Sequence, residues 1–132
     1  MEKQIFKGFN IRVYGLCIVK KELLTLKESF FGKTIAKLPG GGLEFGEGTI
    51  ACLKREFKEE LNVEITVGDA FYIQEDFVES LAKDNKQLLM LYFYATILDL
   101  HNLKVVDKNI EEVNWVSLAN KNPFGLPVDQ IV

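Results

Sequence analysis

Cysteine is scarce in this chain, and the two that occur argue against a disulfide framework. Cys17 and Cys52 stand apart in apolar surroundings, without the close spacing of a metal-binding motif. Small secreted domains that depend on disulfides carry more cysteines at regular spacing. We therefore expect two buried free thiols and a protein that resides in a reducing cytoplasm.

The sequence also lacks an excess of positive charge, a membrane-spanning run and a histidine cluster. Its formal net charge is −3, which predicts no basic surface for polymeric nucleic acid or an anionic membrane. No run approaches the roughly 18 apolar residues that span a bilayer, and the amino terminus has no apolar signal-peptide core. The lone His101 has no partner pattern and is assigned no catalytic role. These absences favour a cytoplasmic protein.

What the chain does contain is a proline–glycine loop followed by a helical pattern, within residues 38–63. Pro39 favours an extended residue before it, and the three glycines that follow permit a tight turn. After Gly48 the apolar residues recur at helical spacing, with Thr49 as the expected N-cap. One helical face is therefore expected to pack through four apolar residues: Ile50, Leu53, Phe57 and Leu61.

Three carboxylates share the neighbouring face of this helix. Glu56, Glu59 and Glu60 repel one another at these spacings unless a cation lies among them. A hard divalent cation such as Mg²⁺ suits carboxylate oxygens and commonly bridges them to substrate phosphates. Arg55 reaches Glu59 at i, i+4 and is expected to orient that carboxylate. The alternative is an ordinary acidic helix that faces solvent.

The spacing of Gly41, Glu47 and the run 55–63 resembles the signature of the Nudix hydrolases, a loop–helix–loop motif that binds metal and diphosphate. The resemblance implies an α/β fold, an α/β/α sandwich around a mixed β-sheet, in a single domain over residues 1–132. It implies that Arg55 and Glu47 support the loop and helix. The family has glycine where this chain has Asn62, a residue that tolerates the left-handed conformation ending a helix. The implied metal ligands are the Gly40 carbonyl, Glu56, Glu59 and Glu60.

The remaining chain predicts mostly strands. The run 87–98 is apolar on both faces, as in a central strand, and forms an antiparallel hairpin with 70–78. Phe45 is expected in the core. Further strands are expected at 11–19, 23–26, 34–38, 103–106 and 111–117, with a charged turn at 20–22, a loop at 28–33 and a short extended piece at 43–45.

Several residues outside the helix are candidates for the site. Phe30 or Phe31 either packs under its loop or lines a pocket and stacks on a ring of the substrate. Gly40 and Gly41 are expected to lie against the diphosphate, as the resemblance implies. Glu112 precedes Trp115 as an acidic residue often does in Nudix proteins, so it is either a further ligand or base, or an exposed strand residue. Weaker candidates for that role are Glu75, Asp76 and Glu79.

The resemblance implies an enzyme that uses Mg²⁺, with Mn²⁺ as an alternative, to hydrolyse a nucleoside diphosphate linked to another moiety. Water attacks phosphorus, and we expect Glu59 to be the general base, with Glu112 as the second candidate. The other reading is a catalytically silent nucleotide-binding or regulatory protein of the same fold. The substrate is expected to be a small molecule of no identified class. A homodimer is a hypothesis.

Overall fold

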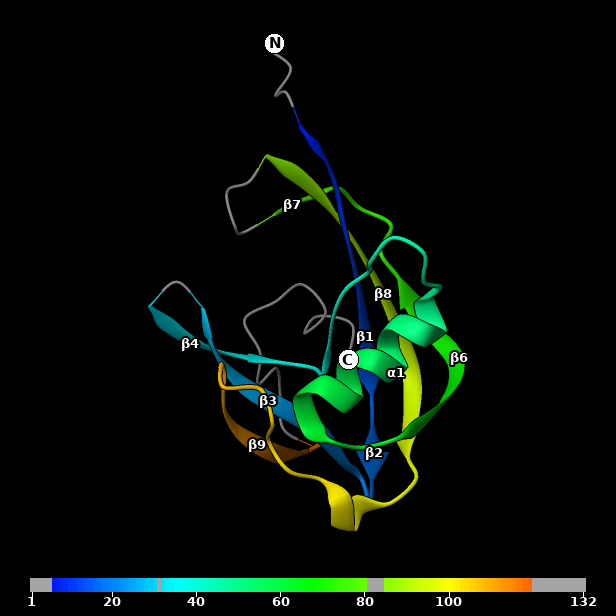
Figure 1. Cartoon of the computed structure of the whole chain (residues 1–132), viewed down its shortest axis with the longest axis vertical. Helices are drawn as coiled ribbons and strands as arrows, with labels where there is room; N and C mark the ends of the chain where they lie inside the picture. The colour runs from blue at the N-terminus through cyan, green and yellow to red at the C-terminus, as the bar shows by residue number, and fades with distance from the viewer. Residues whose placement is uncertain (1–5, 31, 81–84, 120–132) are drawn as a thin grey trace.

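In the computed structural model, the described part of the chain forms two β-sheets and one α-helix. The structure describes residues 6–30, 32–80 and 85–119. In these ranges no helix is long and apolar enough to cross a membrane. Figure 1 shows the helix α1 (Thr49–Leu61) lying across the strands of the larger sheet, with the smaller sheet beside it.

The larger sheet is mixed, as predicted. Its order is β5-β1-β8-β6, and β7 also pairs with β8. The strands β1 and β8 run parallel, and the other pairs are antiparallel. The strand β8 is therefore central, and its predicted antiparallel pairing with 70–78 is confirmed, although that segment is divided between the end of β6 and the start of β7 rather than forming one strand. The bounds are β1 Gly8–Leu16, β5 Gly40–Gly42, β6 Ile65–Ile73, β7 Val78–Glu79 and β8 Lys86–Ile97.

The smaller sheet is entirely antiparallel. Its order is β2-β3-β4, and β9 pairs with the other edge of β3 along most of its length. The charged turn between β2 and β3 places Lys20 and Lys21 at positive φ. The late strand predicted at 111–117 is confirmed as β9. The bounds are β2 Ile18–Val19, β3 Glu22–Phe30, β4 Lys33–Lys37 and β9 Ile110–Ser117.

The apolar face of α1 packs against both sheets. Leu53, Phe57 and Leu61 are fully buried in one core cluster with residues of β1, β3 and β8. Gly15 of β1 lies under Phe57, and a Cβ at this glycine would come within 2.7 Å of the phenyl ring. The predicted burial of Ile50 is wrong, because its side chain in the first helical turn is 50% exposed.

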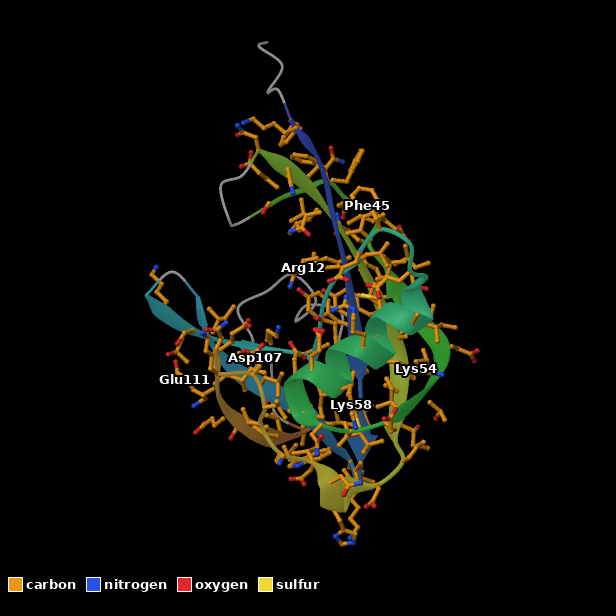
Figure 2. All side chains as sticks on the ribbon, in the orientation of Figure 1. Arg12, Phe45, Lys54, Lys58, Asp107 and Glu111 are labelled. Carbon is orange, nitrogen blue, oxygen red and sulfur yellow. The ribbon has the colours of Figure 1, made fainter. Side chains whose placement is uncertain are left out.

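Of three local expectations about helix ends and the core, two need correction. Gly48 is the N-cap and Thr49 the first helical residue, with no side-chain cap. Phe45 is fully exposed rather than core, and Figure 2 shows it in the loop before α1. Asn62 does adopt the left-handed conformation, with φ 61°, and its backbone N–H donates to the Lys58 carbonyl. The expected C-terminal turn is confirmed.

The expected loop at 28–33 is largely strand. The strand β3 continues to Phe30, and β4 begins at Lys33. Glu28 pairs with Ile35, so cross-strand hydrogen bonds extend beyond the apolar part of the hairpin. Gly32 lies in the tight connection with φ 77°, a value that favours glycine. Polar strand residues in this hairpin therefore hid its true length.

The strand expected at 103–106 is absent, and the segment closes the C-terminal end of α1. A short 3₁₀ turn, η1 (Leu100–Asn102), precedes it. The N–H of Lys104 donates to the Leu61 carbonyl at 3.1 Å, and that of Val106 to the Glu60 carbonyl at 2.9 Å. Because the last carbonyls of a helix have no partner within it, these bonds satisfy them. The backbone of this segment therefore hydrogen-bonds to the end of α1 and not to a neighbouring strand.

Candidate active site

Two glycines of β5 allow close approach, Gly40 to the strand β1 and Gly41 to the helix α1. A Cβ at Gly40, which has φ 144°, would collide with the Val13 carbonyl oxygen and come within 2.7 Å of the Tyr14 Cα. A Cβ at Gly41 would overlap the carboxylate of Glu56. The sequence therefore keeps this edge free of side chains, and a helix carboxylate occupies the space.

Arg55 joins the glycine loop to the helix. Its Nη2 and Nε donate to the two oxygens of Glu47 at 2.7 and 3.0 Å, and Nη2 also donates to the Gly42 carbonyl at 3.0 Å. The hydrogen bonds from Arg55 and from the Glu44 backbone lower the pKa of Glu47 to about 2. Paired parallel bonds between guanidinium and carboxylate fix orientation as well as distance. The loop is therefore held in place before any ligand binds.

The same arginine holds two of the three helix carboxylates. Its Nη1 lies 3.1 Å from Oε1 of Glu56 and 3.1 Å from both oxygens of Glu59. The Glu59 side chain is 53% exposed, whereas that of Glu56 is 14% exposed. Burial raises the pKa of Glu56, against the opposing charge of Arg55. Glu59 is thus the carboxylate open to solvent.

Glu60 is the buried carboxylate, with a side chain 5% exposed. Oε1 accepts a hydrogen bond from the Gly40 N–H at 3.0 Å, and Oε2 lies 3.3 Å from Nζ of Lys37. Burial raises the pKa of Glu60 to about 7, although Lys37 and the Gly40 N–H oppose that change. Burial lowers the pKa of Lys37, but the negative charges of Glu60 and Glu28 outweigh that effect, so the pKa is raised.

The donor set at this junction fits a divalent cation. The described residues contain no ready-made metal site of three or more acidic, cysteine or histidine side chains, and the helix carboxylates are instead paired with Arg55 and Lys37. However, Nζ of Lys37 lies 3.3 Å from both the Gly40 carbonyl oxygen and Glu60. These are hard oxygen donors already arranged about a positive charge, which is the chemistry that Mg²⁺ requires.

The structure does not bring Glu112 to this junction. It pairs with Lys27 across β3 and β9, and the two side chains form an ion pair at 3.0 Å. Lys37, by contrast, pairs with Leu26. Leu26 and Lys27 are adjacent in β3, so their side chains point to opposite faces of the smaller sheet, and each paired residue shares the face of its partner. Glu112 and Lys37 therefore lie on opposite faces.

The candidates around the substrate are placed less completely. Phe30 ends β3, and its side chain and all of Phe31 lie outside the described residues. Gly40 and Gly41 do lie at the carboxylate junction. Glu75 and Asp76 follow β6, and Glu79 lies in β7.

Sequence reasoning missed three charged residues that face the site. Glu28 and Lys37 contact each other at 3.3 Å and bring the hairpin β3–β4 to Glu60. Arg12 lies half-buried in β1, with Nε donating to the Tyr14 hydroxyl at 2.7 Å. The alternation of Leu24, Leu26 and Glu28 was the available signal for Glu28, and the mistaken loop at 28–33 concealed it.

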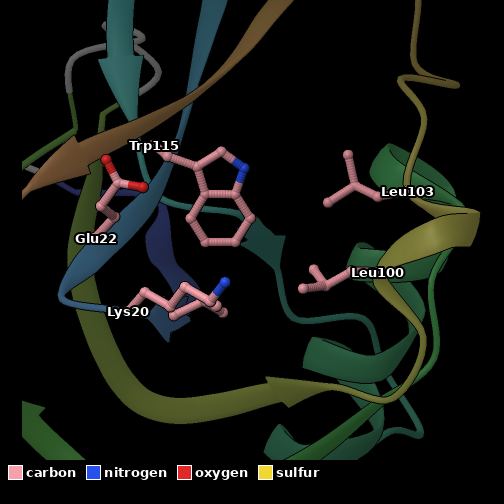
Figure 3. A pocket seen from close by; sticks show the side chains of 6 residues that line it. Lys20, Glu22, Leu100, Leu103 and Trp115 are labelled. Carbon is pink, nitrogen blue, oxygen red and sulfur yellow. The ribbon is translucent and has the colours of Figure 1, made fainter.

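A separate pocket of about 260 Å³ opens beside the smaller sheet. Figure 3 shows the Trp115 ring facing Leu100 and Leu103, with Lys20 and Glu22 nearby. None of the residues predicted for the metal site lines it. The implied metal ligands therefore lie at the junction of α1 and β5 and not in this pocket.

A mixed sheet, a glycine loop and a helix with three carboxylates at its edge are the arrangement that the sequence predicted for a pyrophosphohydrolase. The family model described as NUDIX domain matches residues 9–127. The chain therefore belongs to the Nudix family of pyrophosphohydrolase enzymes, which generally use divalent metal ions. Its fold is the predicted α/β/α sandwich around a mixed sheet, with α1 as its described α-helix.

Individual relatives agree with this assignment. Nucleoside triphosphatase NudI of Enterobacter sp. (strain 638) is 28% identical over 93 residues, which cover 67% of this chain and 66% of that protein. The MutT protein from Methanosarcina mazei Go1 has a TM-score of 0.71 at 25% identity, and the match covers 87% of this chain and 81% of the MutT chain. A NUDIX hydrolase from Nitrosomonas europaea has a TM-score of 0.76 at 21% identity, covering 93% and 84% respectively.

Proposed function

We propose that this protein hydrolyses a nucleoside diphosphate linked to another moiety, as a single Nudix domain over residues 1–132. The observation that carries the proposal is that Glu56 lies against Gly41 and that Glu60 accepts the Gly40 N–H, at the end of a loop clamped by Arg55. A clamped loop keeps these oxygens in position, so little ordering is needed when the substrate arrives. NudI is named a nucleoside triphosphatase, so nucleoside triphosphates come first among the candidate substrates.

We assign the cofactor as Mg²⁺, with Mn²⁺ as an alternative, held by the Gly40 carbonyl, Glu56, Glu60 and Glu59. The cation supplies positive charge at the diphosphate and makes a bound water more acidic. The protein's part is to hold these oxygens near one another and to limit the access of bulk water to Glu60, whose side chain is only 5% exposed. Mg²⁺, a cytoplasmic location and the homodimer remain proposals.

Glu59 is our first choice for the general base. Its carboxylate is half exposed and both oxygens accept hydrogen bonds from Arg55, so it is oriented and still open to water. The water oxygen attacks phosphorus, its proton passes to Glu59, and the bond between phosphorus and the bridging oxygen breaks. Glu112 stays the second candidate, although it lies on the other face of the smaller sheet.

A hydrolysis screen tests this function directly. Wild type, Glu56→Gln and Glu59→Gln are incubated with nucleoside tri- and diphosphate derivatives in Mg²⁺, and the products are separated by chromatography. Glu64→Gln is the matched control, because Glu64 is 67% exposed and pairs only with Lys58 among the contacts described. We expect the two site variants to lose at least about 100-fold in kcat/KM and the control to stay within about twofold.

The outcomes separate the two functions. If a compound binds in the presence of Mg²⁺ but yields no product, the protein is the catalytically silent nucleotide-binding alternative. Hydrolysis that survives Glu56→Gln unchanged would show that the carboxylate junction is not the site. If Glu59→Gln keeps activity within a fewfold of wild type, Glu59 is not the base, and Glu112→Gln becomes the next variant to measure.

A further inference from the structure

Lys37 is a buried cation in the middle of the oxygen donors of the site. The residue is 5% exposed, at the end of β4. Its Nζ lies 3.3 Å from each of three oxygens: the Gly40 carbonyl oxygen, Oε2 of Glu60 and Oε2 of Glu28. A buried ammonium is unfavourable unless charged or polar partners surround it, and here one carbonyl and two carboxylates do so.

Two of these three oxygens belong to the proposed metal ligands. The Gly40 carbonyl and Glu60 cannot direct the same lone pairs at the Lys37 ammonium and at a divalent cation. Lysine suits such an exchange, because its charge sits at the end of a flexible four-carbon stem. Glu28 is the third partner, and its side chain is 21% exposed, more open than that of Glu60. It can therefore keep the ammonium when the other two oxygens are taken.

We propose that Lys37 is an internal counter-cation that competes with the metal for the Gly40 carbonyl and Glu60, and that Glu28 retains its ammonium when the metal binds. This inference rests on the proposed function. In the metal-free protein Lys37 neutralises the buried carboxylate and keeps the loop and helix together. Metal binding transfers the ammonium toward Glu28, so Lys37 and Glu28 set the apparent metal affinity. Both are positioning residues.

Arg12 supplies the matched comparison. It carries the same charge on β1 of the larger sheet, and its described hydrogen bond is to the Tyr14 hydroxyl, so that it acts on Glu56 and Glu28 through charge alone. Removing either charge makes the site more attractive to a cation through space, an effect that falls with distance. Only Lys37 also releases the donor oxygens. Direct competition therefore predicts a larger gain for Lys37→Met than for Arg12→Met.

The experiment measures Mn²⁺ binding to the full chain without substrate, by electron paramagnetic resonance of free Mn²⁺ near neutral pH. We expect Lys37→Met to tighten Mn²⁺ binding by about tenfold or more and Arg12→Met by less than about threefold. Weaker or unchanged binding in Lys37→Met would overturn the proposal, because it would make Lys37 a scaffold for the ligands. Equal gains in the two variants would also overturn it, since charge alone would explain them.

Glu28→Gln tests the second half of the proposal, and the single variant can be measured whether or not Lys37→Met folds. Without the Glu28 carboxylate the displaced ammonium loses its partner, so we expect Mn²⁺ binding to weaken by about fivefold or more. That loss should vanish when Lys37→Met is also present. A loss that persists in the double variant would overturn the role assigned to Glu28, because it would make Glu28 a metal ligand itself.

The failure of this inference can be distinguished from failure of the proposed function. Wild-type protein that binds Mn²⁺, and loses binding in Glu56→Gln, supports the metal site whatever Lys37 does. Wild-type protein that binds no Mn²⁺ at millimolar concentration overturns the proposed function and this inference with it. Thermal unfolding in EDTA accompanies each titration, so that only folded variants are compared.

Discussion

The two ends of the carboxylate face of α1 are held in different ways. Toward the loop, Arg55 holds Glu56 and Glu59 from within the same helix, and Glu59 stays half exposed. At the other end, Glu60 is buried and depends on Lys37 of β4 and on the Gly40 N–H. The first end is built from neighbours in sequence, and the second from a contact between residues 23 positions apart.

This difference separates two tasks of one site. A carboxylate that exchanges protons with water must stay accessible, as Glu59 does. A carboxylate that holds a cation gains from burial, because charges attract more strongly where water is excluded. The cost of burying Glu60 is offset in the metal-free protein by Lys37. Four sets of variants test or refine this comparison.

The largest effect is expected for Gly41→Ala. The new Cβ would overlap the Glu56 carboxylate, the movable end of a side chain, so the carboxylate is displaced while the backbone keeps its place. A displacement of about 1 Å at a reacting site can cost about 100-fold in rate, and we expect a loss of that order in kcat/KM. Gly42→Ala is the control, because its Cβ would meet only an ordinary contact with Arg12 at 3.7 Å. Similar losses in both variants would contradict this account.

The next effect is expected for Arg55→Lys, which keeps the charge but removes the paired bonds to Glu47. A single ammonium cannot hold Glu47, Glu59 and the Gly42 carbonyl together. We expect kcat/KM to fall by about 10- to 100-fold, with the protein still folded by circular dichroism. Lys58→Met, which removes an exposed pair with Glu64, should change activity by less than about twofold. Full activity in Arg55→Lys would show that the paired geometry is dispensable.

The third effect is a pH dependence of opposite sign for Glu60 of the helix and Glu47 of the loop, measured by urea unfolding in EDTA. The pKa of Glu60 is raised from 4.5 to about 7, so the folded protein binds more protons between these values. The free energy of unfolding should therefore fall as pH rises from about 5 to about 8, by on the order of 1 kcal/mol. Burial raises the pKa of Glu56 as well, which adds to the same slope. Glu60→Gln should flatten it, and Glu64→Gln should not.

Glu47 governs the opposite limb of this curve. Its pKa is lowered to about 2, so its contribution to stability is complete above its ordinary value of 4.5 and is lost as pH falls toward 2. Glu47→Gln should make the acid limb shallower and leave the limb above about pH 5 unchanged. If Glu47→Gln and Glu60→Gln change the pH dependence in the same way, Glu47 and Glu60 titrate as one unit.

The smallest effect is expected at Asn62, beyond the buried end of α1. Asn62→Ala should lower the free energy of unfolding by about 1 kcal/mol, because alanine tolerates the left-handed conformation at φ 61° less well. Asn62→Gly should lie within about 0.5 kcal/mol of wild type, since glycine relieves strain but loses the bond from the Asn62 side-chain amide to the Asn102 carbonyl. Urea unfolding measures both. Equal stability of all three proteins would show that this cap contributes little.

Much of the helix and its loop was predictable, because the relevant contacts lie within one turn or one short loop. The i, i+4 spacing of Arg55 and Glu59 predicted the ion pair that the structure contains, and the resemblance to the Nudix signature implied the supporting role of Glu47 and Arg55. The central strand β8 was equally clear, since apolar residues on both faces leave few alternatives. Phe45 and Ile50 were predicted to be buried but are exposed. An apolar pattern does not show whether a residue near the end of an element lies beyond the part that packs against the core. Both strands of the hairpin β3–β4 were predicted, but its tip at 28–33 was misread as a loop for the lack of an apolar alternation there.

The sequence by itself determined the helix, its carboxylate face and the arginine that orients part of it, since their geometry follows from helical periodicity. Only the tertiary structure decided that Lys37 and Glu28 meet Glu60, and that Glu112 lies on the opposite face of its sheet. The reason is that strand pairing sets which distant residues become neighbours, and the faces of polar strands leave little trace in the sequence. The buried charge balance of this site is therefore a property of the assembled sheets.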